Sequence, residues 1–147
     1  MSDTVHIVCP VCAAVNRIPQ QKLTAAPKCG SCKGLLFDGK PLELTANTFN
    51  KFTQRNEIPV VIDCWAPWCG PCRSMAPAFE QAASELEPHV RFAKLNTENE
   101  QGLGASLNIR SIPTLILFVA GKEVIRQGGA LSAADIVRWV KAHISGA

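Results

Sequence analysis

The sequence predicts an α/β fold in which helices flank a central sheet, preceded by a small four-cysteine module. Two observations carry this prediction. Segments with strand-like and helix-like patterns alternate from residue 41 onward, and four of the seven cysteines cluster within residues 9–32. Turn-forming residues gather at residues 38–41, so we expect one domain over residues 1–40 and a second over residues 41–147.

The alternating segments follow the order βαβαβαββα. Residues 59–65 form a nearly continuous apolar run, which is typical of a strand buried on both faces. Ser132 and Asp135 form a helix-capping pattern ahead of an apolar stripe in the last segment. Strands are expected at residues 41–44, 59–65, 90–96, 114–119 and 123–127, and helices at residues 46–55, 71–86, 98–107 and from residue 132 onward.

Composition and charge narrow the function classes. The 147-residue chain has a net charge of +3, and 47% of its residues are apolar, which favours a packed core over disorder. Residues 1–40 hold five lysines and arginines against two aspartates, whereas charges balance over residues 41–147, so the larger part has no basic excess for nucleic acid. No secretory-signal pattern begins the chain, and no apolar run reaches the roughly 18 residues that span a bilayer. We therefore expect a cytoplasmic protein without a membrane partner, whose thiols stay reduced.

Two CxxC pairs, Cys9-Pro-Val-Cys12 and Cys29-Gly-Ser-Cys32, are separated by sixteen residues. Each pair can supply two thiolates from one tight turn, and together they predict one tetrahedral zinc site per chain. No coordination position stays open, so the zinc is expected to be structural. Zinc with four thiolates carries a net charge of −2, which offsets most of the local positive charge. Two local disulfides or free thiols are the alternative. His6 lies nearby, but we expect it to be a strand residue rather than a ligand.

A third CxxC motif, Trp68-Cys69-Gly70-Pro71-Cys72, lies where the apolar strand gives way to a helix. Unpaired N–H groups and the helix dipole stabilise a thiolate there, so Cys69 is expected to be nucleophilic near neutral pH. The two intervening residues let Cys72 close a disulfide with it. The alternative is half of a second zinc site, but no other cysteine pair is left to complete one. The position of the motif within a βαβ pattern therefore favours redox chemistry.

Residues 60–77, VVIDCWAPWCGPCRSMAP, closely resemble the active-site region of the thioredoxin family. The match continues through residues 93–96, 109–114 and 128–132, and so covers essentially all of residues 41–147. With its four-cysteine N-terminus, the whole chain is similar to the zinc-containing bacterial type of this family. The resemblance implies a thioredoxin fold with a central mixed sheet, protein-disulfide reductase activity and no bound organic cofactor.

The resemblance also assigns roles in the reaction. It implies that Cys69 attacks the substrate disulfide and that Cys72 resolves the mixed disulfide, after which NADPH-dependent thioredoxin reductase restores the dithiol. Asp63 stands alone in the apolar strand, where burial would raise its proton affinity, and the resemblance makes it the proton acceptor for Cys72 through water. Lys94 matches the lysine partner of that carboxylate. The alternatives are an edge-strand aspartate facing solvent and a surface lysine.

A substrate-binding surface is implied by the same resemblance. From sequence alone the Ile112–Pro113 bond is expected to be trans, but the resemblance implies a cis bond that lets Ile112 offer its backbone to an extended substrate segment. Gly129 is expected to allow close approach of a partner backbone, with a plain turn glycine as the alternative. The expected surface consists of Trp68, Gly70, Pro71, Ile112, Pro113 and Gly129.

Cys64 departs from the family pattern, which usually has an aromatic residue there. We expect a buried thiol on the opposite face of the strand from Asp63, with a regulatory thiol as the alternative. Two other functions stay open: a disulfide oxidase or isomerase, and a zinc-ribbon interaction module that uses the thioredoxin domain only for binding. The expected partners are thioredoxin reductase and oxidised proteins, and the expected state is a monomer.

Overall fold

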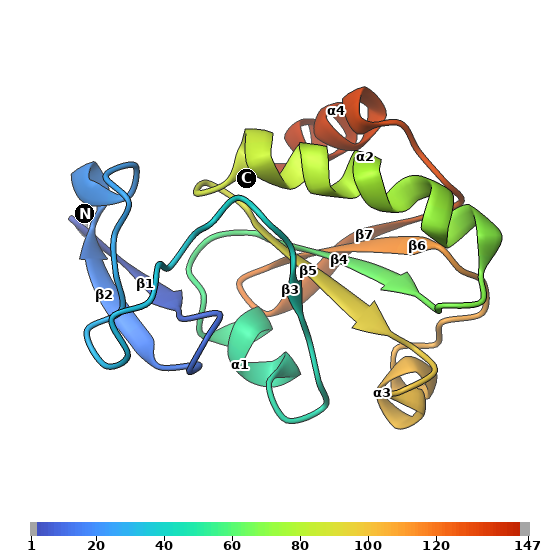
Figure 1. Cartoon of the computed structure of the whole chain (residues 1–147), viewed down its shortest axis with the longest axis horizontal. Coiled ribbons are helices and arrows are strands. Elements are labelled where there is room, and N and C mark those ends of the chain that lie inside the picture. The colour runs from blue at the N-terminus through green and yellow to red at the C-terminus, as the bar shows by residue number, and fades with distance from the viewer. Residues whose placement is uncertain (1–2, 145–147) are drawn as a thin grey trace.

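The computed structural model describes residues 3–144. A five-stranded sheet with the strand order β3-β5-β4-β6-β7 lies at its centre, and a separate two-stranded sheet, β1-β2, lies to one side (Figure 1). The strands are β1 (Thr4–Val8), β2 (Val15–Pro19), β3 (Leu42–Glu43), β4 (Val60–Trp65), β5 (Arg91–Asn96), β6 (Thr114–Val119) and β7 (Lys122–Gly128). The helices are η1 (Gln20–Lys22), α1 (Phe49–Gln54), α2 (Gly70–Leu86), α3 (Gln101–Ser106) and α4 (Ala133–Ile144).

The central sheet is mixed, as the resemblance implies. Strand β4 pairs in parallel with β5 and antiparallel with β6, while β3 extends the parallel part and β7 the antiparallel part. Five of the six residues of β4 are buried, which confirms that its apolar run is a central strand with both faces covered. The parallel strands β4 and β5 end at the same edge of the sheet, where the third CxxC motif begins.

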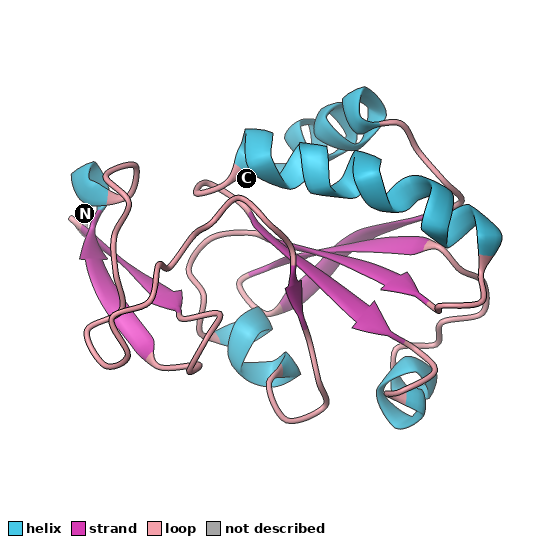
Figure 2. Ribbon diagram, viewed as in Figure 1, coloured by secondary structure: helices cyan, strands magenta, loops and turns pink. Residues whose placement is uncertain are grey.

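Helices cover both faces of this sheet (Figure 2). Because side chains alternate along a strand, β4 contributes Val61 to one core and Ile62 to the other. The first core lies under α2 and α4, where Phe79 packs on Phe92 with ring centroids 5.1 Å apart. The second lies on the face of α1 and contains Phe49 packed edge-on against Phe118.

The N-terminal segment, residues 3–40, is a hairpin followed by a loop that folds back on it. Strands β1 and β2 pair antiparallel, with Val8 opposite Val15, so the first CxxC pair lies in the connection between them. The segment has its own small core, which Ile58 of the larger part joins, and Val8 in turn packs into the core on the α1 face. The two parts of the chain therefore share packed side chains.

The predicted order of elements from residue 41 onward is confirmed, but two helices are shorter than expected. Residues 45–48 form a turn in which the Thr48 N–H donates to the Thr45 carbonyl oxygen and the Thr48 hydroxyl accepts from the Thr45 N–H, so α1 begins only at Phe49. The side-chain oxygen of Asn96 likewise accepts from the N–H groups of two following residues and delays α3. Strands β1 and β2 were not predicted as elements, although His6 of β1 was expected to lie in a strand.

None of the helices within residues 3–144 is long and apolar enough to cross a membrane.

Candidate functional site

Cys69 and Cys72 form a disulfide at the start of α2, with their Cα atoms 5.2 Å apart. Cys69 is the N-cap of the helix, and its Sγ accepts the N–H of Cys72 at 3.2 Å. Pro71 occupies the first turn, where a missing N–H leaves no helical bond unmade. The Cys72 N–H and the positive end of the helix dipole thus lie beside the Cys69 sulfur, and this environment stabilises the negative charge of a thiolate.

The surface around the disulfide combines an exposed aromatic ring with an accessible backbone. Trp68 is 66% exposed, whereas Cys69 is only 5% exposed. The Ile112 carbonyl oxygen lies 3.8 Å from the Cys69 Sγ, and the Ile112–Pro113 bond is cis, the isomer implied by the resemblance. A groove of about 370 Å³ runs beside this loop, lined by Trp68, Thr97, Gln101, Gly104, Ala105, Ile109, Arg110, Ser111 and Ile112.

Asp63 and Lys94 stand opposite each other in the parallel pairing of β4 with β5. Asp63 is fully buried, and neither carboxylate oxygen has a hydrogen-bond partner within the described part of the chain. This burial raises the pKa of Asp63 to about 7, while the positive charge of Lys94 opposes the shift. The Lys94 ammonium lies 4.2 Å from the centre of the Trp65 ring, so it acts on the carboxyl group through charge and also contacts an aromatic face.

The glycines of the expected surface differ in what their backbone requires. Gly129 has φ +93°, a conformation that favours glycine, and its N–H donates to the Pro113 carbonyl oxygen at 2.9 Å. A Cβ at Gly129 or at Gly70 would meet no atom within 4 Å. Within this chain, Gly129 is therefore required by its turn conformation, since the space around it is open.

Cys64 is a free, fully buried thiol in the core on the α1 face, and so lies on the opposite face of β4 from Asp63, as expected. Burial raises its pKa to about 12. A thiol in this state is protonated and inert at neutral pH.

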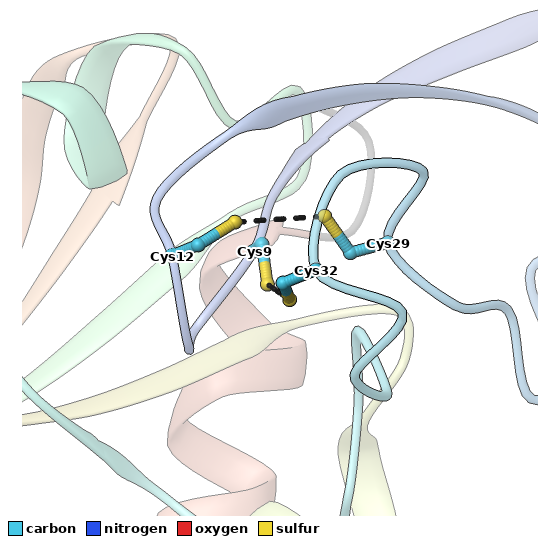
Figure 3. Close-up of side chains that lie close together, drawn as sticks. All are labelled: Cys9, Cys12, Cys29 and Cys32. Carbon is cyan, nitrogen blue, oxygen red and sulfur yellow. Dashed lines mark hydrogen bonds between the residues drawn. The ribbon is translucent and has the colours of Figure 1, made fainter.

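The other four cysteines come together in the N-terminal segment, with their sulfur atoms within 4.8 Å of one another (Figure 3). The Cys9–Cys32 and Cys12–Cys29 sulfur pairs are each 3.6 Å apart. A disulfide requires about 2.05 Å, whereas a tetrahedral zinc site with Zn–S bonds near 2.3 Å separates its sulfurs by about 3.8 Å. All four cysteines are free thiols, and the spacing of their sulfurs fits one shared metal ion.

Backbone and side-chain donors surround the sulfur atoms of this cluster. The N–H groups of Val11, Ser31 and Gly34 donate to Cys9, Cys29 and Cys32 respectively, at 3.3, 3.3 and 3.4 Å. Such bonds stabilise thiolates, the form that binds metal. His6 is not part of the cluster, because its ring pairs with Glu57 at 2.8 Å.

Sequence reasoning missed two side chains beside the cluster. The Asn16 amide nitrogen donates to the Cys29 Sγ at 3.5 Å, and its amide oxygen accepts the N–H of Gly30. The Arg91 guanidinium, from β5, donates to backbone carbonyls next to the cluster. For Asn16, its place four residues after Cys12 was a weak signal. For Arg91 there was none, because its partners lie 83 and 55 residues away.

Comparisons with known proteins agree with this geometry. The family model described as Thioredoxin matches residues 40–142, and the model described as Thioredoxin 2, N-terminal, matches residues 8–34, which hold all four clustered cysteines. Thioredoxin C-3 of Corynebacterium nephridii is 46% identical, over 91% of this chain and 92% of its own length. A thioredoxin of Haemophilus influenzae is 36% identical over 70% of this chain and 96% of its own. The solved structure of chloroplastic thioredoxin z is 28% identical, with a TM-score of 0.68 over 73% of this chain and 96% of its own.

The α/β fold with a dithiol pair at the start of a helix defines the class of the protein as a thiol–disulfide oxidoreductase. The chain belongs to the thioredoxin family, within which it resembles the zinc-containing bacterial type called thioredoxin-2. Its activity is that of a protein-disulfide reductase.

Proposed function

We propose that the chain reduces protein disulfides through the Cys69–Cys72 dithiol and that NADPH-dependent thioredoxin reductase restores the reduced form. The single observation that carries this proposal is the position of Cys69 as the N-cap of α2, with its sulfur bonded to the N–H of Cys72. That position favours a nucleophilic thiolate within bonding reach of a second cysteine.

The reaction takes two exchange steps. The Cys69 thiolate attacks one sulfur of the substrate disulfide, which forms a mixed disulfide and releases the first substrate thiolate. Cys72 then loses its proton and attacks the Cys69 sulfur, so that the mixed disulfide breaks and the second substrate thiolate leaves. The substrate gains two electrons, and the Cys69–Cys72 disulfide holds the oxidised state until the reductase returns two electrons to it.

Asp63 is proposed to take the Cys72 proton through water, with Lys94 as the charge that moderates its pKa. The proposal is supported by the burial of Asp63 on the face of β4 covered by α2, the helix whose first turn carries Cys72. A pKa of about 7 suits a general base that works near neutral pH.

An extended segment of the substrate is proposed to lie across the surface next to the disulfide. The exposed Trp68 ring, the Ile112 carbonyl oxygen beside Cys69, and the groove between them support this proposal. Gly70 and Pro71 are exposed at the start of α2, and Pro113 and Gly129 fix the turn that presents Ile112. An extended backbone recognises the edge of such a turn with little dependence on side chains, which suits a reductase with many targets.

The metal of the four-cysteine cluster is proposed to be zinc, one per chain and structural, because four thiolates leave no open position for chemistry. The division into domains at residues 1–40 and 41–147, a monomeric state, a cytoplasmic location and oxidised proteins as substrates belong to the same proposal. A membrane or nucleic-acid partner is not part of it.

Cysteine variants test the assignment of the dithiol, with reduction of insulin disulfides by NADPH and thioredoxin reductase as the assay. Cys69→Ser should abolish turnover, and Cys72→Ser should accumulate a mixed disulfide with the substrate, because it retains the nucleophile but cannot resolve the adduct. Cys64→Ala is the matched control and should keep full turnover. Turnover by Cys69→Ser above one per cent of wild type would exclude Cys69 as the attacking thiol.

The reduction potential of the dithiol tests the direction of electron flow. Equilibrated against glutathione with the metal retained, the Cys69–Cys72 couple should lie near the roughly −270 mV of reducing thioredoxins. A value near −120 to −180 mV would instead assign the chain to the disulfide oxidases and isomerases.

A further inference from the structure

Arg91 is a buried arginine at the start of β5, on the thioredoxin side of the chain. Its side chain is 1% exposed, although arginine is rarely buried without a specific partner. One of its terminal nitrogens, Nη2, donates to the carbonyl oxygens of Val8 at 3.2 Å and Leu36 at 2.8 Å. Both acceptors belong to the N-terminal segment, so a side chain of the larger part is bonded inside the smaller one.

These two carbonyls belong to the two arms that carry the metal ligands. Val8 directly precedes Cys9 of the first CxxC pair, and Leu36 follows Cys32 of the second pair by four residues. The Phe37 ring, next to Leu36, stacks on the same guanidinium at 4.2 Å. A single rigid group therefore joins the first arm to the second from outside the four-cysteine cluster.

The charge of Arg91 is only partly compensated by protein groups. The Glu87 carboxylate, whose side chain is 2% exposed, lies 3.9 Å from the other terminal nitrogen, and the Nε of Arg91 has no hydrogen-bond partner within residues 3–144. Burial lowers the pKa of Arg91 to about 10, against the negative charges of Glu87, Asp38 and Cys9, so the group is still a cation at neutral pH. Four thiolates around a divalent zinc ion carry a net charge of −2, which a buried cation stabilises.

We propose that Arg91 is a positioning residue for the metal site: its guanidinium fixes the two CxxC arms relative to each other and offsets the negative charge of the loaded cluster. The zinc affinity of the N-terminal segment then depends on a residue of the thioredoxin domain. This inference rests on the proposed zinc site and is independent of the redox reaction at Cys69.

Groups that hydrogen-bond metal ligands typically contribute about 10–100-fold to metal affinity, and we expect a contribution at the lower end of this range from Arg91, which bonds the backbone of both ligand arms. Coupling between two parts of a molecule is also reciprocal, so zinc binding must stabilise the hydrogen-bonded position of the Arg91 side chain by the same free energy. Both directions can be measured on the full chain.

The first experiment measures the zinc dissociation constant by competition with a chromophoric chelator, 4-(2-pyridylazo)resorcinol. Arg91→Met, which removes the charge and both donated bonds, should bind zinc at least tenfold more weakly than wild type. Arg91→Lys keeps the charge but not the planar group, and should stay at least threefold weaker.

Arg126→Met is the matched control. Arg126 also donates to two backbone carbonyls, of Leu107 and Asn108, and pairs with a glutamate, Glu123, but these three partners all lie in the thioredoxin domain. This variant should bind zinc within twofold of wild type. Wild-type zinc affinity in Arg91→Met would show that Arg91 only packs. Wild-type zinc affinity in Arg91→Lys would show that the charge alone matters and would exclude the positioning role.

A second measurement tests the inference on the wild-type chain, and so does not require Arg91→Met to fold. In the wild-type chain, NMR should detect the Arg91 Nε–H and guanidinium protons as slowly exchanging when zinc is bound, with exchange at least tenfold faster after chelation. Equal exchange in both states would overturn the inference. Absence of bound zinc in the purified wild-type chain would instead refute the proposed zinc site itself, so the two failures are distinguishable.

Discussion

Asp63 is fully buried, and both of its carboxylate oxygens lack hydrogen-bond partners within the part of the chain that the structure describes. The charged form of such a group is disfavoured in the folded state, which is why its pKa rises to about 7 from an ordinary value of 3.8. A group retained under these conditions usually has a task other than stability. The proposed task is to receive the Cys72 proton.

The stability of the folded protein should depend on the protonation state of the Asp63 carboxyl group. Between pH 4 and pH 7 the folded chain holds the Asp63 proton and the unfolded chain does not, so the free energy of unfolding should fall as pH rises through this window. The loss ends near pH 7, and a shift of about three units corresponds to an upper bound of roughly 4 kcal/mol. Asp63→Asn should therefore be more stable than wild type by about 2–4 kcal/mol at pH 8 and show little difference at pH 4.

Urea unfolding of both proteins at pH 4, 6 and 8 measures this difference. Glu87, whose pKa is also raised to about 7 by burial, contributes a slope of the same sign in both proteins and cancels in the comparison. The same substitution should slow the resolution of a mixed disulfide at Cys69. Equal stabilities at pH 8 would mean that water or Lys94 compensates the charge.

At the residue scale, sequence reasoning identified groups with a local signal. A lone aspartate in an apolar run, paired cysteines at a fixed spacing and a proline before a strand are all visible along the chain. Arg91 carries no such signal, because an arginine at the start of a strand is typical of a surface position. Its role appears only when residues 8, 36 and 91 are brought together by the fold.

Among the elements, α2 and α4 begin with different caps. The cap of α2 is the Cys69 sulfur itself, so the group that starts the helix is also the reactive one. The cap of α4 is a hydroxyl: Ser132 Oγ accepts the N–H of Asp135 at 3.1 Å, as the capping pattern predicts. Only the Ser132 cap can be removed without changing a reactive group.

Ser132→Ala should thus lower the free energy of unfolding by about 1 kcal/mol, because an N–H of the first turn loses its acceptor. Disulfide reduction by the folded protein should be unchanged. Ser84→Ala, on the exposed side of α2, is the control and should be neutral, since the Ser84 hydroxyl only donates to a helix carbonyl, that of Gln81. An unchanged urea midpoint in Ser132→Ala would exclude a capping contribution.

The boundaries of α1 and α3 show why element ends were harder to predict than element order. Apolar periodicity sets the order, but side-chain bonds to the backbone set the ends. The Thr48 hydroxyl accepts the N–H of Thr45, and the Asn96 side-chain oxygen accepts the N–H of Glu98. Each of these turns delays the helix that follows. The strands β1 and β2 were missed for another reason: the segment is short, and its burial depends on the larger part of the chain.

At the scale of the whole molecule, the two parts of the chain are joined by packing and by hydrogen bonds. Val8 and Ile58 each lie in the core of the other part, and the Val8 N–H donates to the Asn56 side-chain oxygen at 2.7 Å. Loss of order around the four-cysteine cluster must therefore disturb the core on the α1 face as well.

Removal of the metal should lower the melting temperature of the entire chain in one transition. Each kcal/mol of lost free energy corresponds to a shift of about 3 °C for a chain of this size. Scanning calorimetry with and without a zinc chelator, on the oxidised protein so that the thiols of Cys69 and Cys72 are protected, checks this expectation. Two separate transitions, with the main one at its original temperature, would show that the parts unfold independently.

Helix α2 has a further consequence for a chain with seven cysteines. Its 17 residues give it a length of about 25 Å, with the disulfide at its first turn and the N-terminal segment beyond its far end (Figure 1). Exchange between sulfurs requires contact, so the reactive pair cannot reach the four metal-site thiols of its own chain, and Cys64 is enclosed in the core. The helix thus separates the reactive dithiol from the other thiols of the chain and prevents intramolecular disulfide exchange. The electrons held at Cys69 and Cys72 therefore pass only to another molecule.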